Sequence, residues 1–257
     1  MIKEMGSKAL LTTLAMSCGL ASTLAVAAEQ DPAPGQWEWG AQIYLWGAGI
    51  GGTTVGGDDV DISFNDLISN LDFAFMGTLA ARRDRFTLFA DLIYLDVSDG
   101  DTTTANLIGF PVKAEIDVGM KGFISTLGGA YRVLETDNTD LHALAGARYL
   151  KLDADLDIEI AAIGVKESYS DSGSVWDGVV GVKGNTDLTD NWYLSYYADV
   201  GTGNSKVTWQ ALGAVNYRFS KVDAVLGYRY LAWEFDNDDT FDDVNISGPY
   251  AGVKFRW

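Results

Sequence analysis

Apolar and polar side chains alternate along many segments of the chain. Between residues 37 and 46, one face carries Trp37, Trp39, Ala41, Ile43 and Leu45, while the other carries Glu38, Gly40, Gln42, Tyr44 and Trp46. Residues 86–94, 192–200 and 222–230 repeat this period of two. Successive side chains of a strand point to opposite faces, so the pattern predicts an all-β chain.

Ten such segments can be counted, and most exceed the ~9–11 residues that a tilted strand needs to cross a hydrocarbon layer. No helical repeat and no linker rich in Pro or Ser separates them, so they form one domain over residues 29–257. The segments are 36–49, 71–83, 85–98, 113–133, 141–156, 173–186, 191–202, 206–219, 222–236 and 245–257.

The connections between these segments alternate in length. Short ones lie at 83–85, 134–140, 187–191 and 220–221, and long ones around 50–70, 99–112, 157–172 and 237–244, with 202–206 a compact exception. Short turns on one side and long loops on the other are typical of outer-membrane barrels, whose even strand number brings both ends to the periplasm. We predict a closed antiparallel transmembrane β-barrel of about ten strands, with eight or twelve as alternatives.

The first 28 residues are expected to be a secretory signal peptide. Lys3 and Lys8 precede the apolar run 9–26, and small residues then allow cleavage near Ala27 or Ala28. Lipid attachment at Cys18 is the weaker alternative, because the apolar run continues past this cysteine. No later stretch has the ~18 consecutive apolar residues of a transmembrane helix.

The chain is strongly acidic, with 36 Asp and Glu against 18 Lys and Arg. Cleavage of the signal would leave 35 acidic and 16 basic residues, a formal net charge of −19. So acidic a protein is an unlikely partner of nucleic acid. Cleavage also removes the single cysteine, so the mature chain would hold neither a disulfide nor a thiolate metal site.

The last predicted strand ends on outward-facing apolar residues, Val253, Phe255 and Trp257. This ending resembles the assembly signal of bacterial outer-membrane β-barrels. The resemblance implies insertion by the barrel assembly machinery into the outer membrane of a Gram-negative bacterium. The partners expected there are outer-membrane lipids and lipopolysaccharide, and the oligomeric state is left open.

Residues 44–100 carry a closer resemblance. The stretches "YLWGAGIGGT", "SFNDLISNLDFAFMG" and "FADLIYLDVSDG" are similar to an uncharacterised family of proteobacterial outer-membrane proteins. The resemblance implies fold and location, and it implies no chemistry.

Charged residues on the inward face of the strands are the main candidate site. The basic ones are Arg82, Arg132, Arg148, Lys183, Arg218, Arg229, Lys254 and Arg256, and the expected partners are Glu38, Asp91, Asp199, Asp223 and the single histidine, His142. Two interpretations are open. A salt-bridge network fills the lumen, which the narrow width of a ten-strand barrel favours, or a basic ring lines a narrow path that prefers anions.

The predicted outer loops are acidic. The richest of them carries Asp236, Asp238, Asp239, Asp242 and Asp243. Carboxylates bind Ca²⁺ or Mg²⁺, which could bridge this loop to phosphate-bearing lipids, although like-charge blocks are commonly just solvated loops. The spacing does not match an EF-hand.

A short helix is predicted in the first long loop. Ser63 can cap it, and Phe64, Leu67, Ile68 and Leu71 recur at helical spacing. Its apolar stripe can constrict the lumen or pack along the rim, and the sequence leaves both open.

No enzyme is predicted. His142 is the only histidine, so a metal site of several imidazoles is excluded, and no histidine lies in an outer loop, where omptin proteases carry theirs. The sequence favours a structural or surface-interaction role with at most slow passage of small solutes. An anion-preferring, porin-like channel and a surface adhesin or lipid-interacting protein are the alternatives.

Overall fold

The computed structural model describes residues 35–54, 57, 59–107, 110–160, 165–236 and 241–257. The expected signal peptide 1–28, with its boundary and Cys18, lies outside the described residues, so those expectations stay predictions.

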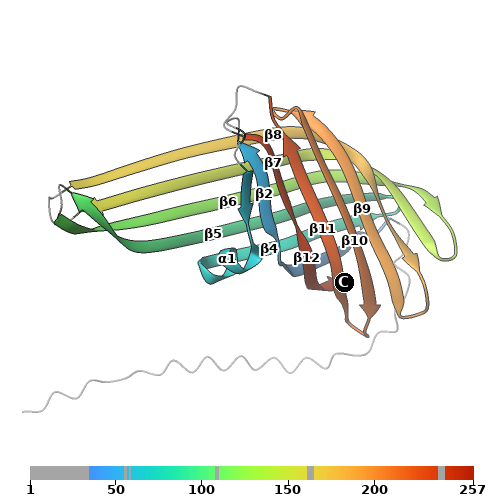
Figure 1. The fold of residues 1–257 in the computed structure, drawn as a ribbon. Coiled ribbons are helices and arrows are strands. Elements are labelled where there is room, and N and C mark those ends of the chain that lie inside the picture. The colour runs from blue at the N-terminus through green and yellow to red at the C-terminus, as the bar shows by residue number, and fades with distance from the viewer. Residues whose placement is uncertain (1–34, 55–56, 58, 108–109, 161–164, 237–240) are drawn as a thin grey trace, which may run out of the picture. The chain divides into compact units, whose positions relative to one another are not determined.

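Ten antiparallel strands form a closed barrel (Figure 1). Each strand pairs with its neighbour, and β12 pairs with β1 to close the sheet. This confirms the predicted fold class and the count of ten. The barrel strands are β1 (Glu38–Trp46), β4 (Leu71–Arg83), β5 (Phe86–Leu107), β6 (Phe110–Glu135), β7 (Thr139–Ile160), β8 (Val165–Asp187), β9 (Trp192–Gly203), β10 (Val207–Arg218), β11 (Val222–Glu234) and β12 (Phe241–Arg256).

The first long connection holds further structure. β2 (Gly49–Thr54) continues along the outer part of β12, and β3 (Asp59–Ile62) pairs with β2. The helix α1 (Phe64–Ser69) follows, as the sequence predicts. Its side chains Phe64 and Ile68 are 40% and 52% exposed.

Helix α1 does not constrict the lumen. It contacts β2, and the Phe64 ring lies 3.7 Å from the position that a Cβ on Gly47 would take. Gly47 follows the inward-facing Trp46, so that position points to the outer side of the wall. Of the two placements left open by the sequence, the structure adopts the one beside the rim. No described helix is long and apolar enough to span a membrane.

The prediction of two long loops is wrong. Residues 99–112 and 157–172 were expected to be loops, whereas β5 continues to Leu107, β6 begins at Phe110, β7 continues to Ile160 and β8 begins at Val165. A strand that projects into water has no lipid-facing side, so the alternation that reveals a membrane strand disappears there. Stretches such as "DTTTAN" therefore look like loops in the sequence.

These extensions of β5, β6, β7 and β8 form an open four-stranded sheet, which we call the outer sheet (Figure 1). β5 loses its partner β4 beyond Val97, and β8 loses its partner β9 beyond Asp177. A 22-residue strand such as β5 is about 70 Å long, about twice what a tilted strand needs to cross a membrane. The outer sheet comprises residues 98–107, 110–119, 155–160 and 165–176.

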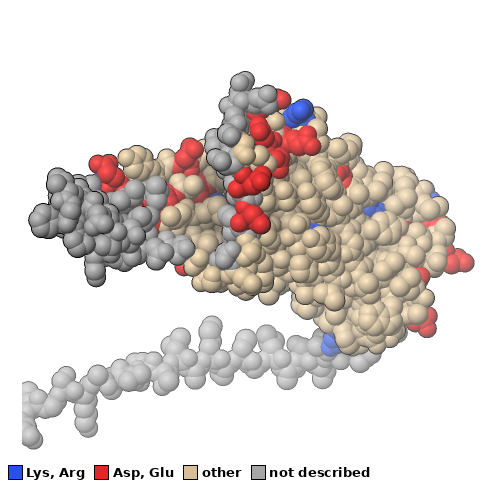
Figure 2. All heavy atoms as spheres, viewed as in Figure 1, with Lys and Arg blue, Asp and Glu red and all other residues tan. Residues whose placement is uncertain are grey.

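The outside of the barrel carries two rings of aromatic side chains. In the ring near the short turns, Trp192 contacts Tyr217 at 4.9 Å between ring centres. In the ring towards the outer sheet, Trp209 stacks on Tyr230 at 4.6 Å. Trp209 and Tyr217 are eight residues apart on β10, about 27 Å along the strand. Such paired rings flank the apolar band of transmembrane barrels, and Figure 2 shows a broad face nearly free of charged side chains.

Placing a charge within this band is expected to destabilise the barrel. Leu226 is 64% exposed on β11, four residues from Tyr230 and four from Val222 at the strand end. We expect Leu226→Arg to lower the free energy of unfolding by about 2–4 kcal/mol, because the guanidinium would face lipid near the midplane. Urea unfolding in lipid vesicles, followed by tryptophan fluorescence, measures the change.

Leu188 supplies the matched control for this substitution. It is 56% exposed but lies in the short turn between β8 and β9. Leu188→Arg should change the free energy of unfolding by less than about 1 kcal/mol, because this turn lies outside the apolar band. Equal effects of the two substitutions would contradict a lipid-facing position for Leu226.

Candidate functional site

The lumen of the barrel is the candidate site, and its side chains differ in character along the barrel axis. Charged groups fill the half near the short turns, and apolar groups fill the half towards the outer sheet. Two buried arginines, Arg148 and Arg229, lie between these halves.

Arg229 bridges the lumen from β11 to β5, strands that are four positions apart around the ten-strand ring. Its guanidinium forms an ion pair with Asp91 at 2.7 Å. It also donates to the Tyr44 hydroxyl at 2.8 Å and to Oε1 of Gln210 at 2.7 Å, and it lies 4.9 Å from the ring centre of Trp46. These partners lie on β1, β5 and β10, so Arg229 ties β1, β5, β10 and β11 together.

Arg148 makes a second buried network from β7. It pairs with Asp199 on β9, and both side chains are fully buried at 0% exposure. It also donates to the Thr208 hydroxyl on β10 at 2.9 Å, and the Tyr197 hydroxyl donates to Asp199. Two opposite charges therefore meet without contact with water in the middle of the lumen.

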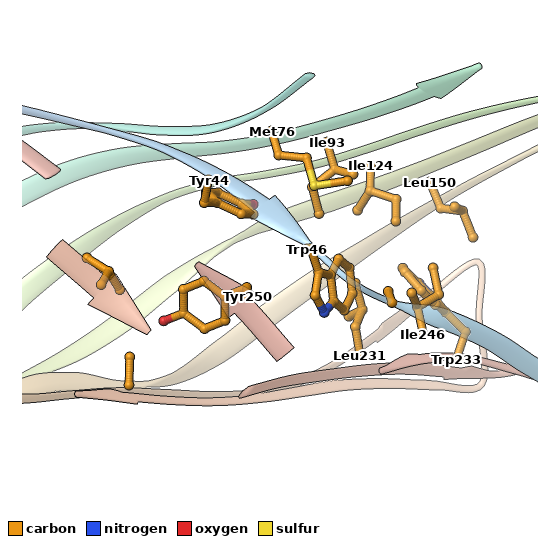
Figure 3. Close-up of a cluster of buried hydrophobic side chains, with 13 residues drawn as sticks. Tyr44, Trp46, Met76, Ile93, Ile124, Leu150, Leu231, Trp233, Ile246 and Tyr250 are labelled. Atoms are coloured by element: carbon orange, nitrogen blue, oxygen red, sulfur yellow. The ribbon is translucent and has the colours of Figure 1, made fainter. Parts of the chain in front are cut away.

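Apolar side chains fill the lumen above these networks (Figure 3). Met76, Ile93, Ile124 and Leu150 point inward from β4 to β7, opposite Leu231 and Trp233 on β11. Trp233 points into the lumen and is only 1% exposed, so the lumen holds no water-filled space around its side chain. We call this group the apolar plug; its remaining labelled members are Tyr44, Trp46, Ile246 and Tyr250.

The charged half of the lumen contains four arginine–carboxylate pairs. Arg82 pairs with Glu38 at 2.6 Å and Arg256 with Asp223 at 2.9 Å. The other two pairs join Arg132 to Glu135 and Arg218 to Asp187. Within the described residues, Lys183 and Lys254 form no ion pair with a carboxylate. We call this region the basic vestibule, defined by Arg82, Arg132, His142, Lys183, Arg218, Lys254 and Arg256.

The structure thus divides the predicted basic set. Arg148 and Arg229 lie apart from the others, in the middle of the lumen, and each of the four expected acidic partners, Glu38, Asp91, Asp199 and Asp223, contacts an arginine. Glu135 and Asp187 are partners that sequence reasoning missed, because they lie at strand ends beyond the regular alternation. Gln210 and Thr208 were missed because neutral inward polar residues give no distinct signal.

Part of the acidic loop lies outside the described residues. Asp238 and Asp239 fall in that part, while Asp236, Asp242 and Asp243 are described. Within the described residues, no group of three or more His, Cys, Asp or Glu could hold a metal ion. Binding of Ca²⁺ or Mg²⁺ at this loop stays a prediction.

Lys151 illustrates the different situation of a lysine outside the lumen. It lies beyond the outer aromatic ring, two residues after Tyr149 in the chain, and donates to Asp153 at 2.7 Å. This hydrogen bond raises the pKa of Lys151 above its ordinary value. A lysine with such a partner contrasts with Lys183 and Lys254.

The expected assembly residues Val253, Phe255 and Trp257 are all exposed on the outer face. Backbone hydrogen bonds join Trp257 to Trp39 in both directions, at 2.9 and 3.0 Å, so the last residue continues the ladder between β12 and β1. Recognition of these residues by an assembly machinery stays a prediction.

His142 lies in the basic vestibule, 3.8 Å from Asp140, and is 4% exposed. Neither of its ring nitrogens has a hydrogen-bond partner within the described residues. A general base needs a hydrogen bond to the group that it activates, and the geometry around His142 supplies none in this state.

The sequence matches no protein-family model and no curated protein. Solved structures that resemble it include the outer membrane protease OmpT from Escherichia coli, at 11% identity and a TM-score of 0.46, covering 92% of this chain and 100% of that one. The translocator domain of autotransporter NalP from Neisseria meningitidis matches at 17% identity and a TM-score of 0.47, and the match covers 88% of this chain and 90% of that one. Acinetobacter baumannii CarO matches at 17% identity and a TM-score of 0.33, and the match covers 85% of this chain and 97% of that one. The fold class stated above rests on this chain's own strand topology.

Proposed function

We propose that this protein is an outer-membrane barrel of a Gram-negative bacterium with a closed lumen, and that it serves a structural or surface-interaction role through its outer sheet. The apolar exterior and its two aromatic rings support the location. The resemblance of residues 44–100 supports a place in the uncharacterised proteobacterial family named above. One observation carries the proposal, namely the ion pair that joins Arg229 to Asp91 across the lumen.

The closed lumen argues against a general diffusion channel. Ten strands enclose a space not much wider than the eight-strand barrels whose side chains fill the interior. Arg229 and Arg148 are buried to 2% and 0% exposure, and the apolar plug lies directly beyond them. An ion entering from the short-turn end would meet this unhydrated apolar layer and would lose its hydration without compensation.

The outer sheet offers a surface for contacts outside the membrane. Its described side chains include the exposed carboxylates Asp117, Asp155, Asp157, Glu167 and Asp171. This acidic surface fits a cationic partner or lipid phosphates bridged by divalent cations. An adhesin-like or lipid-interacting role is the form of surface interaction that this chemistry favours.

Conductance measurement tests the closed lumen. We expect the purified protein in a planar bilayer to show no discrete current steps, whereas a variant with Trp46, Arg229 and Trp233 all replaced by Ala should conduct. Folding of both proteins is checked by the difference in gel mobility between boiled and unboiled samples. Anion-preferring steps from the unaltered protein would overturn the proposal in favour of a narrow channel.

A shortened variant tests the outer sheet. Ser98 pairs directly with Gly119, and Asp155 with Ser170, so an Asn-Gly turn can replace residues 99–118 and another can replace 156–169 without a change of register. The shortened barrel should keep its heat-dependent gel mobility and lose binding to vesicles containing lipopolysaccharide and Ca²⁺. Unchanged vesicle binding would contradict a role for the outer sheet.

A further inference from the structure

Three neighbouring strands place basic groups side by side in the basic vestibule. Arg132 on β6 is paired with His142 on β7, and His142 is paired with Lys183 on β8. All three lie on the lumen face. The two cationic side chains of this row, Arg132 and Lys183, lie on either side of His142, and a cation withdrawn from water is costly unless it is paired. Arg132 obtains it from Glu135, and Lys183 has no carboxylate within ion-pair distance in the described part of the chain.

The ammonium groups of Lys183 and Lys254 point into the same part of the basic vestibule. The Lys183 ammonium lies 4.9 Å from the ring centre of Phe89. Lys254 approaches from β12, donates to the Tyr193 hydroxyl at 3.1 Å and is close enough to Lys183 for the two charges to act on each other. Asp140 acts electrostatically on Lys183, and Asp223 acts on Lys254, yet neither carboxylate forms an ion pair with a lysine. Asp140 accepts from Asn185, and Asp223 accepts from Arg256 and Tyr193. Within the described residues, the two ammonium groups therefore lie near each other without a carboxylate at ion-pair distance.

His142 provides an independent sign of a missing partner. The residue is only 4% exposed, and neither of its ring nitrogens has a hydrogen-bond partner in the described part of the chain. Nε of Arg132, on the paired strand, is also buried and has no partner among the same residues. Buried polar groups are nearly always satisfied, so each exception calls for an explanation such as a ligand.

The two ends of the basic vestibule differ in their contact with solvent. Phe89 packs edge-on against Tyr197 at 6.4 Å, and the buried pair of Arg148 and Asp199 lies beyond them. At the short-turn end, the side chains of Arg82 and Arg256 are 40% and 48% exposed. The vestibule is therefore in contact with solvent at the short-turn end, whereas the buried pair of Arg148 and Asp199 and the apolar plug separate it from the outer sheet.

From these observations we propose that the basic vestibule binds a small oxyanion such as phosphate between Lys183 and Lys254, with His142 as a further hydrogen-bond donor. A tetrahedral oxyanion offers several acceptor oxygens and up to two charges, which matches two ammonium groups and an imidazole. The site is a dead end and transports nothing, so it adds a binding activity to the closed barrel proposed above. It does not depend on the outer sheet or on any surface partner.

Titration with inorganic phosphate tests this site. The full barrel in detergent is titrated by isothermal calorimetry, and ³¹P line broadening gives a second readout. We expect saturable binding with one site for each chain, and at least a tenfold loss of affinity in the double variant Lys183→Met, Lys254→Met. Methionine keeps most of the side-chain length and removes the charge.

Lys151→Met is the matched control, since Lys151 lies outside the lumen and has Asp153 as its partner. It should bind phosphate as tightly as the unaltered protein. In the absence of phosphate, the double variant should unfold at a higher urea concentration than the unaltered protein, because two repelling charges are gone. Three results would overturn the proposal. The first is no binding at about 10 mM phosphate, a concentration that would detect even a weak site. The others are an equal loss of affinity in Lys151→Met and full affinity in a correctly folded double variant.

Discussion

Replacement of Arg229 by alanine is expected to lower the free energy of unfolding by about 3–5 kcal/mol, which is the effect of removing one partner from a buried ion pair. The guanidinium is nearly inaccessible to water and is bonded to Asp91, Tyr44 and Gln210. Without it, the Asp91 carboxylate keeps hydrogen bonds from Tyr44 and Thr78 but loses its counter-charge. Urea unfolding in lipid vesicles measures the change.

A double variant separates the loss of the pair from the loss of packing. Arg229→Met with Asp91→Leu removes both charges and keeps apolar volume in the same place. Buried ion pairs are often replaceable by apolar groups at little or no cost. We expect the double variant to recover most of the stability lost in Arg229→Ala. If it were as unstable as the single variant, the destabilisation would come from lost packing and hydrogen bonds and not from an unpaired carboxylate.

The ten strands could be predicted from the sequence because lipid imposes a simple rule on them. Every lipid-facing position must be apolar, while the opposite positions are free to be polar. In β11, for example, Leu226, Tyr228 and Tyr230 face out and alternate with Gly227 and Arg229. The rule weakens where lipid ends, which is why the sequence predicts loops at residues 99–112 and 157–172 of the outer sheet.

The apolar plug could not be predicted, because inward positions follow no comparable rule. Leu231 and Trp233 face the lumen, yet their neighbour Ala232 is also apolar, so both faces of this part of β11 look alike. An apolar run of this kind is compatible with several placements. Only the meeting of β11 with β4 to β7 across the lumen brings these side chains into one cluster.

The pairing of charges was also beyond the sequence. Alternation determines which face a residue occupies, but contacts across a barrel depend on strand tilt and stagger. Arg218 meets Asp187 from a strand two positions away, and Arg229 meets Asp91 from four positions away. The sequence therefore predicts which charged residues face the lumen. It does not predict that Arg148 and Arg229 form ion pairs in the middle of the lumen, apart from the basic vestibule.

Replacement of Trp233 by alanine is expected to cost about 3–5 kcal/mol, as for other buried tryptophans, because it would leave a cavity in the apolar plug. Trp233→Phe should cost less than about 1.5 kcal/mol, since it keeps most of the volume and Nε1 of Trp233 has no hydrogen-bond partner among the described residues. Trp209→Ala is the control from the outer face. Its cost should be about 1 kcal/mol, the value of its stacking on Tyr230, because lipid chains can fill the space that the indole leaves. Urea unfolding of the three variants in lipid vesicles measures their free energies of unfolding. If Trp233→Ala cost no more than Trp209→Ala, lipid or water would have to reach the lumen at the level of Trp233. A solid apolar plug requires the opposite order, because no solvent inside the barrel can replace the lost contacts.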